Sequence, residues 1–276
     1  MVARYFMFGS EWLYLKIYSG PKTIEDIFIT VLTPKIQFAL NRNIIDSFFF
    51  IRYQDPDYHI RLRFHLSSQN SISILSNMLN EALKKYIENH IIIKFQVETY
   101  VREIERYGVN NILDVEKIFF LDSSFIVQYL FFYNCEDNRR WEMSMKFINM
   151  FLCKYIKSIE DIISFVEKNS ENYLKEQYNN NKSITKILNK KYQKIRDKID
   201  TILKKNDDIH WEDKILYDYI ENTKLSDSLE SKDLYSILTS IIHMHVNRMF
   251  RSNQRITECV IYFYLKKYYK SLKYKY

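Results

Sequence analysis

Residues 58–65 alternate two chemical kinds of side chain, and this alternation constrains the fold more than any other part of the chain. Basic side chains stand at every second position (His59, Arg61, Arg63 and His65), with Ile60, Leu62 and Phe64 between them. Because successive side chains of a β-strand point to opposite faces, the basic residues should share one face and the apolar residues the other. The run therefore predicts a half-buried strand that presents two guanidinium forks, which suit carboxylates or phosphates.

The segments around this strand predict a sheet interrupted by helices. Residues 13–18, 48–53 and 91–101 are typical of strands, whereas residues 23–39, with Thr23 as N-cap, and residues 71–88 have helical patterns. A hairpin turn at residues 54–57 should bring Arg52 of the partner strand beside the two arginines as a third member. Four strands and two helices in this order favour a split β-α-β-like sheet.

Beyond residue 112 the sequence is mainly helical, which predicts an α+β protein with a small mixed or antiparallel sheet in its front half. The chain has only three glycines and three prolines, as expected for a helix-rich fold with few tight turns. Polar stretches at residues 179–181 and 204–208 predict connections. We expect one domain over residues 1–276, with a sheet-containing part at 1–110 and a helical part at 111–276.

The net charge is +7, with much of the excess in residues 182–205 and in the C-terminal tail. Basic helices of this density are usually solvated faces, so the 182–205 segment receives no assigned role. No basic and apolar leader opens the chain, no apolar run is long enough to cross a bilayer, and the three cysteines are widely spaced. We expect a cytoplasmic protein without membrane insertion, disulfides, metal or other cofactor.

A second pattern lies at residues 99–108, where a strand runs into a turn marked by Gly108. If this segment coils into a helical turn, Glu103 and Arg106 lie three residues apart and brace each other. The acid then stays ionised and the guanidinium stays in place. A plain surface salt bridge is the alternative when the segment is considered alone.

A third pattern is His243-Met244-His245-Val246-Asn247-Arg248, near the end of a long helix that begins around residue 227 or 231. On a helix His243 and Asn247 share a face, whereas His245 points to nearly the opposite side, so the two histidines cannot hold one metal ion. A histidine oriented by an amide suits acid–base chemistry. A histidine satisfied in the core is the alternative.

Taken together, four ordered blocks resemble the C-terminal domain of lantibiotic dehydratases, which also occurs in thiopeptide-type bacteriocin biosynthesis proteins. The blocks are residues 12–18, 48–63, 103–108 and 243–248, so the resemblance covers nearly the whole chain. It implies a lyase that eliminates glutamate from glutamylated Ser or Thr of a ribosomal precursor peptide. It also implies a stand-alone subunit, a separate glutamylating protein that uses glutamyl-tRNA, no tRNA requirement for this chain, and a homodimer by family precedent.

The resemblance places catalytic residues at Arg61, Arg63, Arg106 and His243. The arginines would hold the carboxylates of the glutamyl group and stabilise developing charge, while His243 would move the α proton. Supporting or substrate-binding residues would be Glu103, Arg52, Asn247, Arg248, His59 and Tyr107.

Two other functions stay open. Stand-alone members also resemble thiopeptide pyridine synthases, which join two dehydroalanines by a formal four-plus-two cycloaddition. A non-catalytic subunit could instead capture a peptide by strand addition at an exposed sheet edge. The cycloaddition has no glutamate to bind, and strand addition requires neither the arginines nor His243, so these residues favour elimination.

Overall fold

The computed structural model describes residues 2–179, 181–204, 211–226 and 229–273, and the chain divides into two compact units. The first unit comprises Met1–Glu136 and Thr223–Leu229, and the second comprises Asp137–Asn222 and Glu230–Tyr276. The single domain expected over residues 1–276, with its parts at 1–110 and 111–276, stays a prediction. Part of the predicted connection at 204–208 lies outside the described residues, as does residue 180.

The first unit is built on an antiparallel sheet with the strand order β3–β4–β2–β5. The strands are β2 (Trp12–Tyr18), β3 (Ile45–Gln54), β4 (Tyr58–Leu66) and β5 (Lys94–Glu98). Helical segments connect β2 to β3 and β4 to β5, whereas a hairpin joins β3 to β4. This is the split β-α-β arrangement that the sequence predicted, and the α+β class is confirmed.

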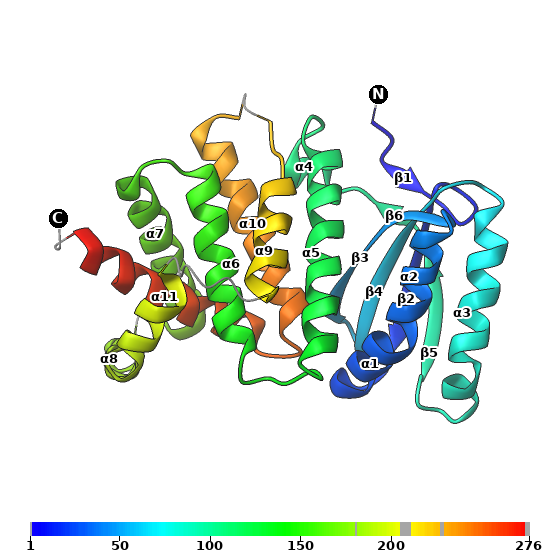
Figure 1. Cartoon of the computed structure of the whole chain (residues 1–276), viewed down its shortest axis with the longest axis horizontal. Coiled ribbons are helices and arrows are strands. Elements are labelled where there is room, and N and C mark those ends of the chain that lie inside the picture. The colour runs from blue at the N-terminus through cyan, green and yellow to red at the C-terminus, as the bar shows by residue number, and fades with distance from the viewer. Residues whose placement is uncertain (1, 180, 205–210, 227–228, 274–276) are drawn as a thin grey trace. The chain divides into compact units, whose positions relative to one another are not determined.

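The helical segments of this unit are α1 (Pro21–Ile27), the π-helical turn η1 (Phe28–Leu32), α2 (Thr33–Asn41) and α3 (Ser71–Glu88). The first three follow one another without a break and start at Pro21, two residues before the predicted N-cap Thr23. Proline suits this first position because its missing N–H would have no partner inside the helix. Helices α2 and α3 pack against each other, and Figure 1 shows them beside the sheet.

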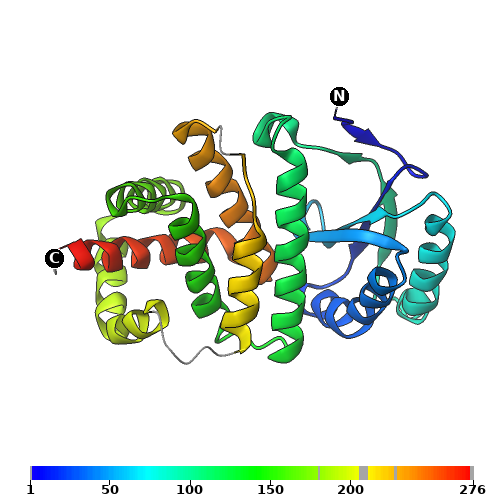
Figure 2. The same ribbon diagram turned by 45° about the horizontal axis from the view of Figure 1, so that its top comes forward.

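The two faces of the sheet bury different kinds of side chain. Ile60, Leu62 and Phe64 of β4 are fully buried. Their face also carries Phe50, whose ring centre lies 4.6 Å from that of Phe28 on η1, so this is the helix-covered face. Helix α5 (Ile112–Phe132) packs against β3, and Figure 2 shows it next to the sheet. There the Ser123 hydroxyl accepts a hydrogen bond of 3.3 Å from the backbone N–H of Phe50.

The strand predicted at residues 91–101 is divided into two. The strand β5 ends before Thr99, and the next two residues form β6 (Tyr100–Val101). Strand β6 pairs with β1 (Tyr5–Phe6) in a separate small sheet. The single turn of helix α4 (Ile104–Tyr107) follows.

Helices make up the described part of the second unit. They are α6 (Arg140–Tyr155), α7 (Ile159–Tyr178), α8 (Lys182–Leu203), α9 (Trp211–Asn222), α10 (Ser231–Met249) and α11 (Gln254–Lys273). Helix α11 lies at the centre and packs against α6, α7, α8 and α10. Within the described ranges of the whole chain, none of the helices combines the length and apolar character needed to cross a membrane.

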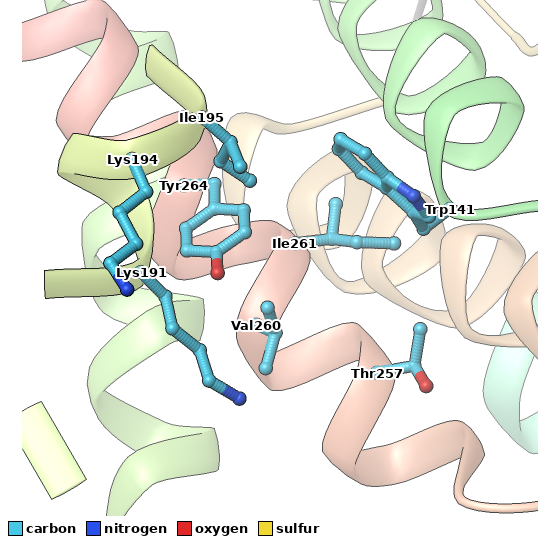
Figure 3. Close-up of a pocket in the computed structure, with 8 residues that line it drawn as sticks. All are labelled: Trp141, Lys191, Lys194, Ile195, Thr257, Val260, Ile261 and Tyr264. Atoms are coloured by element: carbon cyan, nitrogen blue, oxygen red, sulfur yellow. The ribbon is translucent and has the colours of Figure 1, made fainter. Parts of the chain in front are cut away.

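A groove of about 400 Å³ opens between α6, α8 and α11 (Figure 3). Its lining is mostly apolar, with Trp141, Val260 and Tyr264 among its walls, and Lys191 and Lys194 of the basic segment stand at one side. The groove contains none of the predicted site residues.

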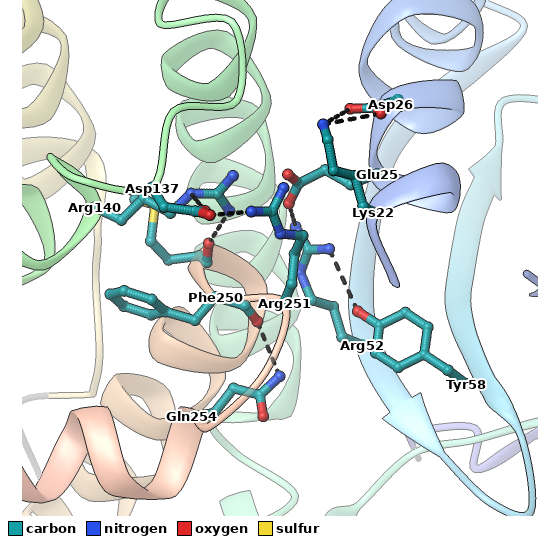
Figure 4. Close-up of polar contacts among 11 residues, drawn as sticks. Lys22, Glu25, Asp26, Arg52, Tyr58, Asp137, Arg140, Phe250, Arg251 and Gln254 are labelled. Atoms are coloured by element: carbon teal, nitrogen blue, oxygen red, sulfur yellow. Dashed lines mark hydrogen bonds and ion pairs between the residues drawn. The ribbon is translucent and has the colours of Figure 1, made fainter. Parts of the chain in front are cut away.

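Arg52 does not join the arginines of β4, which corrects the sequence prediction. The hairpin register places Arg52 opposite Ile60, so its side chain points to the helix-covered face of the sheet. There its Nη2 lies 2.5 Å from Oε2 of Glu25, and both side chains are fully buried (Figure 4). The guanidinium therefore belongs to a buried ion pair between β3 and α1.

Glu25→Gln should lower the free energy of unfolding by about 3 kcal/mol or more, because Arg52 keeps its buried charge and loses this carboxylate. Urea denaturation followed by circular dichroism measures the loss. The control is Asp26→Asn, which breaks the exposed 3.0 Å pair with Lys22 on the same helix and should cost less than about 1 kcal/mol. Equal effects of the two substitutions would contradict the importance of burial.

Candidate functional site

The second face of the sheet carries the basic side chains of β4. Arg61 stands opposite Lys16 of β2, and Arg63 stands opposite Tyr14 of β2 and Phe49 of β3. His59 and His65 lie on this same face because they occupy alternate positions of the strand. We call it the basic face.

Arg63 is enclosed by aromatic rings. The carbon centre of its guanidinium lies 4.3 Å from the ring centre of Tyr14, 5.1 Å from that of Phe49 and 5.2 Å from that of Tyr100. Only 9% of the residue is exposed. The negative faces of aromatic rings attract a cation, so this cage fixes the guanidinium without neutralising it.

Arg63 has no acidic partner among the residues that the structure describes. It forms no ion pair there, and its buried Nε–H finds no hydrogen-bond acceptor. Burial lowers the pKa of Arg63, and the nearby charge of Arg61 acts in the same direction. A guanidinium nevertheless stays protonated in proteins, so the basic face carries a buried positive charge that forms no ion pair with any described residue.

Arg61 is held by a neutral histidine. Its Nε–H donates a 3.2 Å hydrogen bond to Nε2 of His59, and its guanidinium lies 3.5 Å from the ring centre of Tyr53. His59 is fully buried and places Nδ1 2.9 Å from the carbonyl oxygen of Asp57. Burial lowers the pKa of His59, and Arg61 and Lys16 lower it further. The ring therefore keeps its proton on Nδ1 and orients Arg61 through Nε2.

The wall of the cage at Tyr100 is itself fixed by a buried carboxylate. The Tyr100 hydroxyl donates a 2.6 Å hydrogen bond to Glu116 of α5, and Arg102 binds both oxygens of Glu116 at 2.7 and 2.8 Å. Burial, followed by the charge of Glu116, raises the pKa of Tyr100. The phenol therefore stays neutral and in place beside Arg63.

Glu103 and Arg106 brace each other across α4, as the sequence predicted. Nη1 of Arg106 lies 3.0 Å from Oε2 of Glu103, and both side chains are about half exposed. Gly108 ends the turn with a φ of 79°, a value that glycine adopts without strain. The charge of Glu103 also reaches Arg63, whose protonated form it favours. Tyr107 instead packs into the core, with its ring centre 5.7 Å from that of Phe119.

In the second unit, His243 is paired with a buried acid. Its Nδ1 lies 2.8 Å from Oε2 of Glu258 on α11, and a fifth of its side chain is exposed while Glu258 is fully buried. His245 is fully buried, stacks on Phe147 with ring centres 3.9 Å apart and places Nε2 3.2 Å from the Ser144 hydroxyl. Helix α10 therefore separates the two histidines as predicted, and His245 is the core residue.

The remaining predicted residues of α10 are Asn247, which is half-buried, and Arg248, which is fully buried. His243, Asn247 and Arg248 belong to the second unit, whereas the basic face and α4 belong to the first. It stays a prediction that His243 converges with the arginines. The catalytic and supporting roles of the predicted site residues also stay predictions.

Sequence reasoning missed Glu258. The sequence signal was a single acid directly before the apolar run at residues 259–265. Counting from Glu258, the residues three, four and seven positions later are Ile261, Tyr262 and Leu265, which form one buried face of α11 together with Glu258. An acid on such a face needs a partner, and His243 is that partner.

In the described ranges, no three His, Cys, Asp or Glu side chains are grouped so that they could hold a metal ion. In general, guanidinium groups such as those on β4 can bind anions, and an oriented imidazole such as that on α10 can transfer a proton.

Comparisons with known proteins relate this chain to a protein family. The family model described as "Lantibiotic biosynthesis dehydratase C-term" matches residues 12–269. The chain is 29% identical over 282 residues to "Nisin biosynthesis protein NisB" of Lactococcus lactis subsp. lactis, covering 96% of this chain and 26% of that protein. It is 27% identical over 285 residues to "Subtilin biosynthesis protein SpaB" of Bacillus subtilis, covering 94% and 26%. The chain thus spans about a quarter of the length of these relatives.

Solved structures share the fold. The tRNA-dependent lantibiotic dehydratase MibB from Microbispora sp. 107891 matches with a TM-score of 0.65 and 17% identity, over 100% of this chain and 29% of that chain. The pyridine synthase TbtD from thiomuracin biosynthesis matches with a TM-score of 0.68 and 11% identity, over 95% and 99%. At these identities the likeness shows the fold alone.

The lowered pKa of His59 makes stability depend on pH. The unfolded chain takes up a proton at this ring before the folded protein does, so the free energy of unfolding should fall as the pH drops from above to below the ordinary histidine pKa of 6.5. Urea unfolding across this range should show a shallower decline for His59→Gln than for the wild type. The control is His90→Asn, at an exposed histidine whose φ of 55° asparagine tolerates, and it should keep the wild-type slope. An unchanged slope in His59→Gln would contradict the neutral assignment.

Proposed function

Because the chain belongs to the family of lantibiotic dehydratase C-terminal domains, we propose that it eliminates glutamate from glutamylated Ser or Thr in a ribosomal precursor peptide. The products would be a dehydroalanine or dehydrobutyrine and free glutamate. A separate glutamylating protein or domain that uses glutamyl-tRNA would supply the ester, and this domain itself would not need tRNA.

The observation that carries the proposal is the caged Arg63. A buried guanidinium without an acidic partner in the described structure is costly by itself, and a bound carboxylate would give it the missing counter-charge. Arg61, two residues along the same face and already oriented by His59, offers a second fork for an acidic group. Together they suit a substrate that carries a carboxylate and releases another.

The elimination requires a base and cationic groups. The base removes the α proton of the esterified residue, the electron pair forms the Cα–Cβ double bond, and the Cβ–O bond breaks to release the glutamyl carboxylate. We assign the proton transfer to His243 and the binding of the glutamyl group to Arg61, Arg63 and Arg106. Glu103 would keep Arg106 in place through their 3.0 Å ion pair.

The same observation supports elimination over the two alternatives. Joining two dehydroalanines involves no carboxylate leaving group, and capture of a peptide at a strand edge relies on backbone hydrogen bonds. Neither activity gives a reason to hold, inside an aromatic cage, a guanidinium that lacks an acidic partner in the described part of the chain. Elimination does, because charge develops on a carboxylate as the ester bond breaks.

Arg63→Ala and His243→Gln should each slow the release of glutamate on the order of 100-fold or more, since each removes a group that acts in the transition state. The substrate is a synthetic peptide with a glutamyl ester on one serine, and mass spectrometry follows its conversion to the dehydroalanine peptide. Arg63→Lys, which keeps the charge and loses the planar fork, should be intermediate.

The control is Arg42→Ala, at an exposed arginine after α2, which should react at the wild-type rate. Full dehydration by Arg63→Ala or His243→Gln would reject the assignment of these residues. A wild-type protein that binds the peptide but never releases glutamate would instead favour the non-catalytic role, and consumption of a peptide with two dehydroalanines would favour cycloaddition.

A further inference from the structure

Glu258 has no part in the proposed elimination and yet contacts its base. It projects from α11 toward α10, where its Oε2 lies 2.8 Å from Nδ1 of His243. The carboxylate is fully buried, whereas a fifth of the His243 side chain is exposed. A buried carboxylate accepts hydrogen bonds and cannot donate them when ionised, so it selects the imidazole form that carries a proton on Nδ1.

Two tyrosines lie near the buried carboxylate of Glu258, whose Oε1 finds no hydrogen-bond partner among the described residues. Tyr173 on α7 and Tyr262 on α11 both lie close to it, and burial, followed by the charge of Glu258, raises the pKa of each phenol. The Tyr173 hydroxyl also accepts a 3.0 Å hydrogen bond from Nη1 of Arg255. Both tyrosines therefore stay uncharged, and Arg255 is the cationic group connected to this cluster through Tyr173. In such an environment a hydrogen bond to a carboxylate is strong.

We propose that Glu258 is a positioning residue that holds His243 as the Nδ1–H tautomer, so that Nε2 is the nitrogen that takes the α proton. The inference rests on the proposed elimination for its role in catalysis, but the tautomer itself follows from the contact between α10 and α11. His245 does not share this function, because its ring is sealed against Phe147 and Ser144.

The tautomer can be measured without a substrate. In full-length protein labelled with ¹⁵N-histidine, two-bond correlation spectra at mildly alkaline pH distinguish a protonated from an unprotonated ring nitrogen, and a His243→Gln sample assigns the signals. We expect a protonated Nδ1 and an unprotonated Nε2 for His243. A proton on Nε2 would overturn the inference whatever the activity of the protein.

Kinetics on the glutamyl-serine peptide test the catalytic consequence. Glu258→Gln should reduce kcat on the order of 100-fold or more and leave KM unchanged, because it disturbs the base and not the binding of the glutamyl group. Glu258→Asp keeps a carboxylate and should recover part of kcat together with the wild-type tautomer. The control is Glu171→Gln, which breaks an exposed pair with Lys266 and should have wild-type kinetics.

The outcomes separate this inference from the proposed function. Wild-type kcat in Glu258→Gln, or a raised KM with unchanged kcat, would overturn the positioning role. Failure of Glu258→Gln to fold, detected by circular dichroism, leaves the wild-type tautomer and the Glu258→Asp kinetics to decide. A wild-type protein that shows the Nδ1–H tautomer but releases no glutamate would reject the elimination and support the positioning of His243 by Glu258.

Discussion

The alternation of side chains along β4 is the constraint on which the basic face depends. Strand β4 lies between β3 and β2, and its Ile60, Leu62 and Phe64 are fully buried against the helix-covered face. Each of these side chains contributes roughly 1.5–3 kcal/mol by burial. A register slip of one residue would turn all three to the other face and bring the arginines under the helices. The packing of the core therefore determines where the guanidinium groups stand.

Three arginines of this protein differ in their burial and in whether an acidic side chain pairs with them. Arg52 is fully buried and neutralised by Glu25, Arg106 is half exposed beside Glu103, and Arg63 is buried among aromatic rings. A cation–π contact stabilises by about 0.5–2 kcal/mol, whereas removing an ion from water costs several kcal/mol. The three ring contacts of Arg63 can offset much of this cost, but they bring no negative charge to it. Arg63 differs in this respect from Arg52 and Arg106, each of which forms an ion pair with an acidic side chain.

Local sequence patterns correctly predicted the structural features that depend on residues close together in the sequence. The alternation of β4, the hairpin before it, the spacing of Glu103 and Arg106 and the opposite orientations of His243 and His245 were all correct. Features that depend on partners distant in sequence were missed or wrong. Arg52 was assigned to the wrong face because the hairpin register was unknown, and the cage around Arg63 combines Tyr14, Phe49 and Tyr100 from three strands. Glu258 was missed because its partner lies on another helix.

The two compact units are not continuous stretches of the chain. Residues Thr223–Leu229 belong to the first unit although both of their flanks belong to the second, and Leu225 within them is buried. During synthesis the ribosome therefore completes the sheet and α5 long before it delivers the segment that finishes their unit. No single cut between residues would yield both units whole, so the sheet with its arginines cannot be separated from the helices with their histidine by truncating the chain at one point.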